Sequence, residues 1–290
     1  MKKLGNEYYE RKQYTEAISC YTRAISLEPE EASLYGNRCA AYLMLENYAA
    51  ALEDALTSIK LDDKFVKGYL RAGKCYINTG NFVKARETLS RGMLIDRKNR
   101  SLKAEEQRLN RIEGLMKDVK EHIDNRKFRD ALGLLGSSEF NGCNFPAYLI
   151  FQARCMLGMK EYEKALAITG VIIRTDSSNV EAIEIRGRCL YFTGNSSSAQ
   201  QHFQQALRLD PDNVGCRDLL RQIKKVEALK KDANDLFSNQ EWSKAESLYT
   251  EAISHDSPDP QMNKTLFSNR AAARSSQGEH FRKEVPFIET

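Results

Sequence analysis

The sequence predicts an all-α solenoid of helical hairpins, and three observations lead to this fold class. Ala17, Ala51 and Ala85 lie 34 residues apart, and three tyrosines keep the same spacing. An alanine series with this spacing returns later in the chain. Only 6 of the 290 residues are proline and 16 are glycine, so long stretches are free of helix breakers. The two further series are Tyr8, Tyr42 and Tyr76, and Ala131, Ala165 and Ala199.

A period of 34 residues is typical of tetratricopeptide (TPR) repeats, in which each repeat is a helix-turn-helix hairpin. Such hairpins stack on their neighbours rather than around one large core, and the likeness to TPR repeats implies a right-handed superhelix. The first helix of each hairpin, helix A, lines the concave groove, and helix B packs behind it. Because concave surfaces of this kind bind other molecules, the fold class favours a binding protein.

Composition and charge argue against several other classes of protein. The net charge of +4 is too small to indicate binding to nucleic acid or to an anionic membrane. The seven cysteines include no CxxC pair and no histidine at ligand spacing, so we expect buried, reduced thiols and neither a metal nor a cofactor. The sequence has no apolar leader and no apolar stretch of membrane-spanning length. We therefore expect a cytoplasmic protein, which can also be nuclear.

The first repeat block, residues 1–98, contains three repeats with the same packing residues. Gly5 and Ala17 allow the two helices of the first hairpin to approach closely, and Pro29 ends that hairpin. We assign the periodic tyrosines and alanines to the core. They set the register of the repeats and carry no chemistry.

A helical insert separates the first block from the second. Ala85 and Ala131 are 46 residues apart, which exceeds the repeat spacing by 12 residues. Residues 100–123 are rich in helix formers and have an apolar face, which predicts an extended helix, and we assign 99–116 to the connection. The apolar face consists of Leu109, Ile112, Leu115, Met116 and Val119.

The middle block, residues 117–216, is predicted to hold about three repeats, the first of them irregular. His122 stands where the first block has tyrosine, and the segment 136–146 is long for a connection within a hairpin. Apolar residues occupy positions of helix A that are polar in the first block. We assign Ile150, Phe151 and Ile185 to packing, and the alternative is a groove for an apolar segment of another protein partner.

A third block is predicted over residues 217–276. It has a long helix at 218–237, a second helix that carries Ala245, a turn at 256–260, and a helix A at about 264–276. A divergent tail, 277–290, follows without a helix B. Because a solenoid normally ends in a polar capping element, we expect a truncated or alternatively spliced form.

Five polar residues on helix A of the first three repeats are candidates for a binding site. Lys2 and Asn6 are four residues apart, as are Lys67 and Arg71, so each pair shares a helix face, and Asn37 lies on the helix between them. Taken singly, each would be a solvated surface residue, and Asn37 would equally suit a turn or a cap. Together, their ammonium, guanidinium and amide groups suit a compact dianion. The natural example is a terminal peptide residue with a carboxylate side chain.

This pattern resembles the carboxylate clamp of TPR co-chaperones, which bind the C-terminal Glu-Glu-Val-Asp tails of heat shock protein 70 and heat shock protein 90. All five positions match that clamp. Segments 61–68 and 187–191 are similar to the DnaJ-related members of this family, and the likeness covers residues 1–276. The resemblance implies that the five residues hold the two carboxylates of the last aspartate.

DnaJ-related members carry a second clamp in their last repeats, and this sequence matches a part of it. Lys230 and Asn234 match the first helix of that clamp and Asn269 matches the second, whereas no third helix supplies the lysine and arginine. The family also has a J domain, whose His-Pro-Asp motif stimulates the ATPase of the chaperone. No histidine of this sequence is followed by Pro-Asp, so we expect no such stimulation.

The sequence thus predicts a co-chaperone-type adaptor that binds chaperone tails and, through its middle block, other proteins. The alternative is a passive TPR scaffold that joins partners without binding a chaperone tail. An enzyme is not expected, because the sequence contains no phosphate loop, no HExxH motif and no GxSxG motif.

Overall fold

The computed structural model describes residues 1–255 and 260–284, with side chains described up to residue 278. The regular elements in these ranges are all helical, which confirms the predicted fold class. The chain divides into two compact units, Met1–Phe151 and Gln152–Thr290, and each is described by itself. The described helices include none that is both long enough and apolar enough to cross a membrane.

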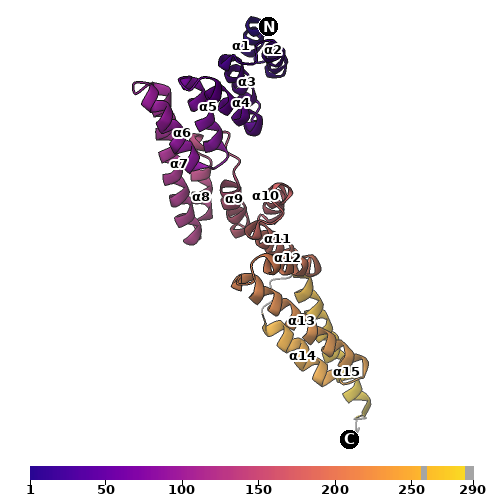
Figure 1. The fold of residues 1–290 in the computed structure, drawn as a ribbon. Helices are drawn as coiled ribbons and strands as arrows, with labels where there is room; N and C mark the ends of the chain where they lie inside the picture. The colour runs from indigo at the N-terminus through magenta and orange to yellow at the C-terminus, as the bar shows by residue number, and fades with distance from the viewer. Residues whose placement is uncertain (256–259, 285–290) are drawn as a thin grey trace. The chain divides into compact units, whose positions relative to one another are not determined.

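The first unit consists of helical hairpins, each with a helix A followed by a helix B (Figure 1). The last hairpin has a long helix A and a short helix B, after which comes a short 3-10 helix, η1 (Ser138–Phe140), and the start of α9 (Pro146–Gly158). The hairpins are α1 (Lys2–Glu10) with α2 (Tyr14–Leu27), α3 (Ala32–Met44) with α4 (Tyr48–Leu61), α5 (Val66–Asn78) with α6 (Phe82–Ile95), and α7 (Arg100–Asp124) with α8 (Phe128–Leu135).

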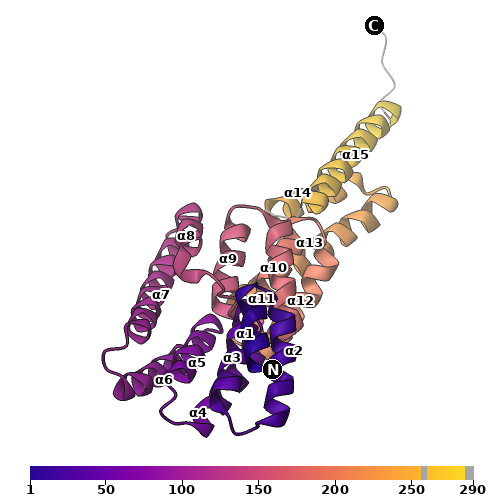
Figure 2. The same cartoon turned by 90° about the horizontal axis from the view of Figure 1, so that it is seen from above.

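The helices A of the first unit lie side by side in chain order. α1 contacts α3, α3 contacts α5, and α5 contacts α7, while each also packs against its own helix B. Figure 2 shows this pairing for α7 and α8. Ala17, Ala51, Ala85 and Ala131 are fully buried, as predicted. A methyl side chain at these positions lets the helices approach closely.

The structure corrects the prediction that the periodic tyrosines belong to the core. Tyr8, Tyr42 and Tyr76 pack against the buried clusters but are themselves only half-buried, so they lie at the edge of the core. A phenol ring has an apolar body and a polar tip, and this edge position accommodates both. The buried tyrosines of this unit include Tyr21 and Tyr69, which do not belong to that series.

The turn between helix A and helix B has the same backbone conformation in every hairpin of both units. One residue in each turn has a positive φ, but only Gly80 and Gly194 among them are glycines. A left-handed conformation costs other residues roughly 1–2 kcal/mol. The packing of the two helices therefore sets the turn geometry against the local preference of the chain. The remaining turn residues are Lys12, Glu46, Arg126, Lys160 and Gln240.

The segment 136–145, which follows α8, is held by one arginine of α7. Arg108 donates hydrogen bonds to the backbone carbonyl oxygens of Glu139, at 2.9 Å, and of Asn141, at 3.0 Å. It also forms an ion pair with the buried Glu105 at 2.9 Å. These bonds pair carbonyl groups of a segment that contains no α-helix.

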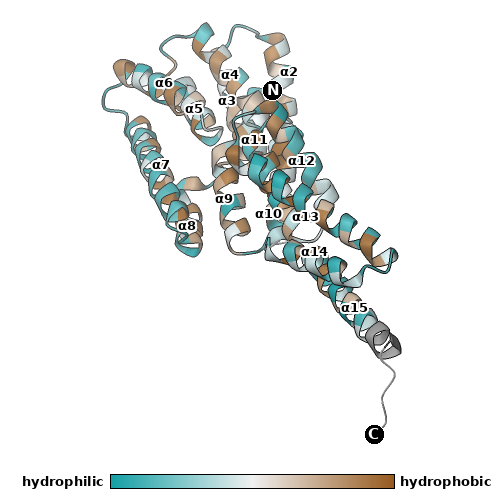
Figure 3. Ribbon diagram, turned by 90° about the horizontal axis from the view of Figure 1, so that it is seen from below, coloured by the Kyte–Doolittle hydropathy of each residue, from teal (hydrophilic) through white to brown (hydrophobic). Residues whose placement is uncertain are grey.

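The second unit continues the series of helices after α9. Two of its buried clusters lie around Phe203, between α11, α12 and α13, and around Tyr249, between α13, α14 and α15. Hydrophobic and hydrophilic residues alternate along these helices, as expected of helices with one buried face (Figure 3). The helices are α10 (Tyr162–Thr175), α11 (Val180–Phe192), α12 (Ser196–Leu209), α13 (Val214–Ser238), α14 (Trp242–Ser254) and α15 (Pro260–Glu284).

α15 is longer than the helix predicted over residues 264–276. It begins at Pro260, and proline suits the first position of a helix because its missing amide hydrogen is not needed there. It continues to Glu284, since a single glycine, Gly278, weakens a helix by only about 1 kcal/mol. The first residues of the predicted tail are thus helical. Residues 285–290 of that tail and residues 256–259 of the predicted turn lie outside the described residues.

All seven cysteines are buried free thiols, as predicted. Six lie on helices, and Cys143 lies in the segment that Arg108 holds. Burial raises the pKa of the Cys155 thiol to about 11. Such thiols are packing groups rather than nucleophiles. Of the three apolar residues assigned to packing, Ile150 and Ile185 are buried and Phe151 is half-buried, which favours packing for the two isoleucines.

Candidate functional site

A pocket of about 180 Å³ lies among the helices of the first unit, and we call it the Asn6 pocket. Because α1, α3 and α5 lie side by side, residues of three consecutive repeats meet in its wall, and α2 contributes from behind. Three of the five predicted clamp residues are brought together here. The lining residues are Asn6, Tyr9, Glu10, Tyr21, Asn37, Ala40 and Arg71.

Two hydrogen bonds hold the side-chain amide of Asn6. Its Oδ1 accepts from the Tyr21 hydroxyl at 2.8 Å and from Asn37 Nδ2 at 3.2 Å. Tyr21 is only 2% exposed, and burial raises its pKa to about 12, so its hydroxyl stays protonated at neutral pH. Gly5 leaves room for this ring, because a Cβ at that position would lie 2.6 Å from the ring atom Cε1 of Tyr21.

Arg71 on α5 brings a cation into the Asn6 pocket. Its Nη1 atom is buried and has no hydrogen-bond partner among the described residues. Burial lowers the pKa of this guanidinium, which still remains charged at neutral pH. Gly36 on α3 makes the space for it, since a Cβ there would lie 2.8 Å from Nη1. A buried charged donor without a partner is costly, which makes Nη1 a candidate donor for a bound acceptor.

The two predicted clamp lysines do not line the Asn6 pocket. Lys2 Nζ donates to Glu31 Oε1 at 3.3 Å and to the Ser33 hydroxyl, where α3 begins. The hydroxyl of Ser33 and, next, Lys2 lower the pKa of Glu31. Lys67 is exposed on α5, one turn before Arg71. Each lysine thus lies one helical turn from a residue that does line the pocket.

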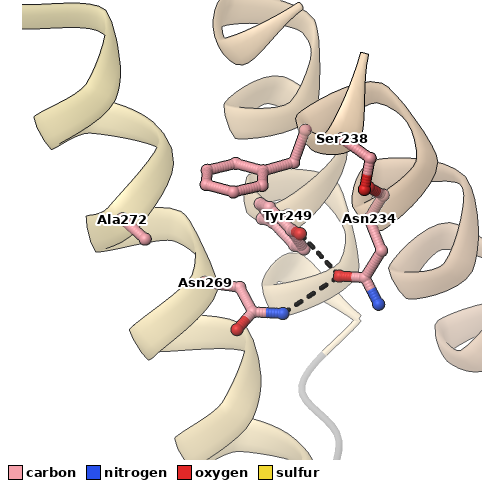
Figure 4. Close-up of a pocket in the computed structure, with 6 residues that line it drawn as sticks. Asn234, Ser238, Tyr249, Asn269 and Ala272 are labelled. Atoms are coloured by element: carbon pink, nitrogen blue, oxygen red, sulfur yellow. Dashed lines mark hydrogen bonds between the residues drawn. The ribbon is translucent and has the colours of Figure 1, made fainter. Parts of the chain in front are cut away.

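A second pocket, of about 210 Å³, lies between α13, α14 and α15, and we call it the Asn234 pocket (Figure 4). The Tyr249 hydroxyl donates to Asn234 Oδ1 at 2.6 Å, and Asn269 Nδ2 donates to the same oxygen at 3.0 Å. Figure 4 shows Asn269 reaching Asn234 from the neighbouring helix. The lining residues are Asn234, Phe237, Ser238, Tyr249, Asn269 and Ala272.

The two pockets correspond residue by residue. In each, the asparagine of the first helix precedes the tyrosine of the next helix by 15 residues. The Asn234 pocket has Phe237 where the Asn6 pocket has Tyr9, and Ser238 where it has Glu10. Of the side chains that line the Asn234 pocket in the described part of the chain, none is cationic, so Arg71 has no counterpart there.

Lys230, the third residue of the predicted partial clamp, does not line the Asn234 pocket. It is half-buried on α13, one turn before Asn234, and lines a separate cavity of about 540 Å³. The start of α12 and Thr265 of α15 line the same cavity. The structure therefore brings the two asparagines together and leaves the lysine beside them, the same relation that Lys2 has to the Asn6 pocket.

Sequence reasoning missed the tyrosines that complete both pockets. Tyr21 and Tyr249 lie on helix B, where the repeat pattern indicates packing alone. The available signal is their equal spacing from Asn6 and Asn234, and it becomes meaningful only after the asparagines are recognised as site residues. Glu10, which is exposed at the Asn6 pocket, belongs to no pattern in the sequence.

Comparison with known proteins agrees with the TPR architecture. A family model described as a TPR repeat matches residues 5–46, and one described as a tetratricopeptide repeat matches residues 180–213. The solved structure of the P58(IPK) TPR domain matches with a TM-score of 0.58 at 19% sequence identity, over 94% of this chain and 77% of that chain. At this identity the likeness shows the fold alone.

Two relatives match the chain over most of its length. DnaJ homolog subfamily C member 7 from Homo sapiens is 36% identical over 274 residues, which cover 94% of this chain and 56% of the human protein. The homolog of that protein from Dictyostelium discoideum is 34% identical over 280 residues, with 94% of this chain and 51% of the relative covered. The chain thus spans about half the length of these relatives.

Proposed function

The chain is a tetratricopeptide-repeat protein homologous to DnaJ homolog subfamily C member 7, and from this we propose that it is a co-chaperone-type adaptor. Its first unit would bind the C-terminal tails of heat shock protein 70 and heat shock protein 90. Lys2, Asn6, Asn37, Lys67 and Arg71 would form the carboxylate clamp that holds the Glu-Glu-Val-Asp end of those tails.

The observation that carries this proposal is the buried Nη1 of Arg71, which has no partner among the described residues. It lies in one pocket wall with the amides of Asn6 and Asn37. A carboxylate accepts several hydrogen bonds at once and forms its strongest ones with a guanidinium. The terminal carboxylate of a peptide fits this set of donors.

The two lysines add charge at the edge of the pocket. Each has a long, flexible side chain one turn away from the wall, so it can reach a ligand without a change in the backbone. In this proposal Lys2 leaves Glu31 and Ser33 when the peptide binds. Both lysines are exposed, and added salt is therefore expected to weaken the interaction.

Isothermal titration of the full chain with a peptide ending in Glu-Glu-Val-Asp tests the proposal. Arg71→Ala and Lys67→Ala should each raise the Kd about tenfold or more, because a hydrogen bond to a charged group is worth about 1.5–3 kcal/mol. Arg23→Ala is the matched control, since Arg23 is an exposed arginine of α2 outside the pocket and its loss changes the net charge equally.

Two outcomes would count against the clamp. One is the absence of any binding heat with the natural chain, and the other is an equal loss of affinity in Arg71→Ala and Arg23→Ala. Partners that are still retained after Lys2, Lys67 and Arg71 are all replaced would favour the passive scaffold.

We further propose that Asn234 and Asn269, with Lys230 beside them, form a second acceptor-binding site. The support is the repeated hydrogen-bond arrangement around Asn234 Oδ1. The same titration tests this site through its stoichiometry. We expect the natural chain to bind two peptides and the Asn269→Ala variant to bind one. A natural chain that binds one peptide at all concentrations would contradict the second site.

A further inference from the structure

The side-chain oxygen of Asn6 is fully used within the protein. An amide oxygen has two lone pairs, and Asn6 Oδ1 accepts one hydrogen bond from Tyr21 and one from Asn37. The Nδ2 group of Asn6 has no hydrogen-bond partner in the part of the chain that the structure describes. The two hydrogen bonds to Oδ1 therefore fix which end of the amide is left for a ligand.

This arrangement determines what Asn6 and the neighbouring Arg71 offer to a ligand. Asn6 presents only N–H donors, and the neighbouring Arg71 Nη1 is also a donor. A group that only accepts hydrogen bonds, such as a carboxylate, can pair with both. A carboxamide brings its own N–H donors, which would find no acceptor on Asn6 Nδ2 or Arg71 Nη1.

The contribution of Tyr21 is separable from packing. Its ring is buried beneath Gly5, where α1 and α2 approach closely, and this places the hydroxyl one residue further along, at Asn6. Phenylalanine at this position would keep the ring and its contacts. The hydroxyl would be lost, and the Asn6 amide could then turn its oxygen toward the pocket.

The second unit repeats the arrangement independently. Tyr249 and Asn269 both donate to Asn234 Oδ1 (Figure 4). Asn234 lies on α13 of the second unit, whereas Asn6 lies on α1 of the first. Two asparagines and one tyrosine therefore form the same arrangement twice. A tyrosine required only for packing would not need its hydroxyl to meet an asparagine oxygen in both places.

We propose that Tyr21 is a positioning residue that makes the Asn6 pocket selective for a carboxylate over a carboxamide, by holding Asn6 with its amide nitrogen toward the ligand. The proposal rests on the proposed function and adds a determinant of specificity to it. Tyr21 does not itself contact the ligand in this scheme and acts through Asn6.

The test compares Tyr21→Phe with the natural full chain, using a peptide that ends in Glu-Glu-Val-Asp and the same peptide with a C-terminal carboxamide. Tyr21→Phe should raise the Kd for the carboxylate peptide about three- to tenfold, the effect of one net hydrogen bond. It should also reduce the ratio of the Kd for the carboxamide peptide to the Kd for the carboxylate peptide. In an Asn6→Ala background, Tyr21→Phe should change the Kd no further, because the two residues act as one unit.

The matched control is Tyr69→Phe. Tyr69 is buried to a similar degree, and its hydroxyl donates to the Asp63 carbonyl at 3.0 Å, outside the pocket. This variant should bind both peptides like the natural chain. The proposal would be overturned if the ratio of the two Kd values were unchanged in Tyr21→Phe. It would also be overturned if Tyr21→Phe changed the Kd equally in the natural chain and in the Asn6→Ala background.

A measurement without ligand separates this proposal from the proposed function. The side-chain amide signals of Asn6 in a ¹⁵N–¹H spectrum should shift in Tyr21→Phe and stay in place in Tyr69→Phe. Unshifted Asn6 signals in Tyr21→Phe would overturn the positioning role whether or not the peptide binds. If the Asn6 signals shift in Tyr21→Phe but the natural chain does not bind the carboxylate peptide, the result would contradict the proposed function instead.

Discussion

At the scale of single residues, two glycines admit the large side chains of the Asn6 pocket. Gly5 leaves room for the ring of Tyr21, and Gly36 leaves room for the guanidinium of Arg71. A glycine within a helix costs about 1 kcal/mol relative to alanine. α1 and α3 are therefore less stable as helices at the positions where a Cβ would collide with these side chains.

Glu31 reports whether Lys2 takes part in binding. In the free chain the Ser33 hydroxyl and Lys2 lower the pKa of Glu31, so its carboxylate remains ionised as the pH falls and loses these partners only below that lowered pKa. If Lys2 moves to the carboxylate of a peptide, the pKa of Glu31 should rise on binding. An NMR titration of the Glu31 side chain with and without the peptide measures this.

Two variants of the free chain serve as references for that titration. Ser33→Ala and Lys2→Ala should each raise the pKa of Glu31, because the hydroxyl and the ammonium both lower it in the natural chain. A Glu31 pKa that stays the same when the peptide binds would show that Lys2 keeps its contact and lies outside the clamp.

At the scale of helices and turns, the first unit is held by bonds between segments that are distant in the chain. Arg108 of α7 pairs with carbonyl groups of the segment 136–145 and with Asn78 Oδ1 of α5, at 3.0 Å. The Tyr48 hydroxyl of α4 donates to the Gly142 carbonyl at 2.6 Å. Three helices thus anchor one segment that has little regular structure of its own.

Arg108→Met should therefore lower the free energy of unfolding by about 2–4 kcal/mol, because it deprives the buried acceptors Glu105 and Asn78 of this partner. Urea denaturation measures this loss. Arg111→Met is the control on the same helix, since Arg111 is 52% exposed and pairs with the Glu139 carboxylate at 2.7 Å. Exposed ion pairs contribute only about 0–1 kcal/mol. Equal losses in the two variants would contradict the anchoring role.

The repeat spacing predicts the helices well and the site only in part. It places Asn6, Asn37 and Arg71 on neighbouring helices, and the structure brings them into one pocket. It does not predict where Lys2 points, because a long side chain takes the partners that packing places nearby, here Glu31 and Ser33.

The role of Tyr21 and the conformation of the turns could not be predicted for a different reason. Tyrosine on helix B is equally suited to packing, so its residue type does not indicate a hydrogen bond to Asn6. In the turns, residues such as Lys12 and Glu46 adopt a positive φ that their own preferences disfavour. Both features arise from contacts between helices rather than from local sequence.

At the scale of the whole molecule, each unit has a pocket with the same arrangement of asparagines and a tyrosine. Among the described residues, a cation lines the Asn6 pocket of the first unit and none lines the Asn234 pocket of the second. The net charge of +4 on the chain is small, so attraction for an acidic tail must come from the few cations near a pocket. The first unit is therefore the stronger candidate for binding an acidic tail, because it carries Arg71, Lys2 and Lys67.

The central claim is that the Asn6 pocket binds a C-terminal carboxylate, and side-chain NMR of the full chain tests it most directly. When a peptide ending in Glu-Glu-Val-Asp is added, we predict that the guanidinium signal of Arg71 and the amide signals of Asn6 and Asn37 shift together. The same peptide with a C-terminal carboxamide should leave them nearly unchanged. A peptide that binds while these three side chains keep their signals, and others shift instead, would contradict the account.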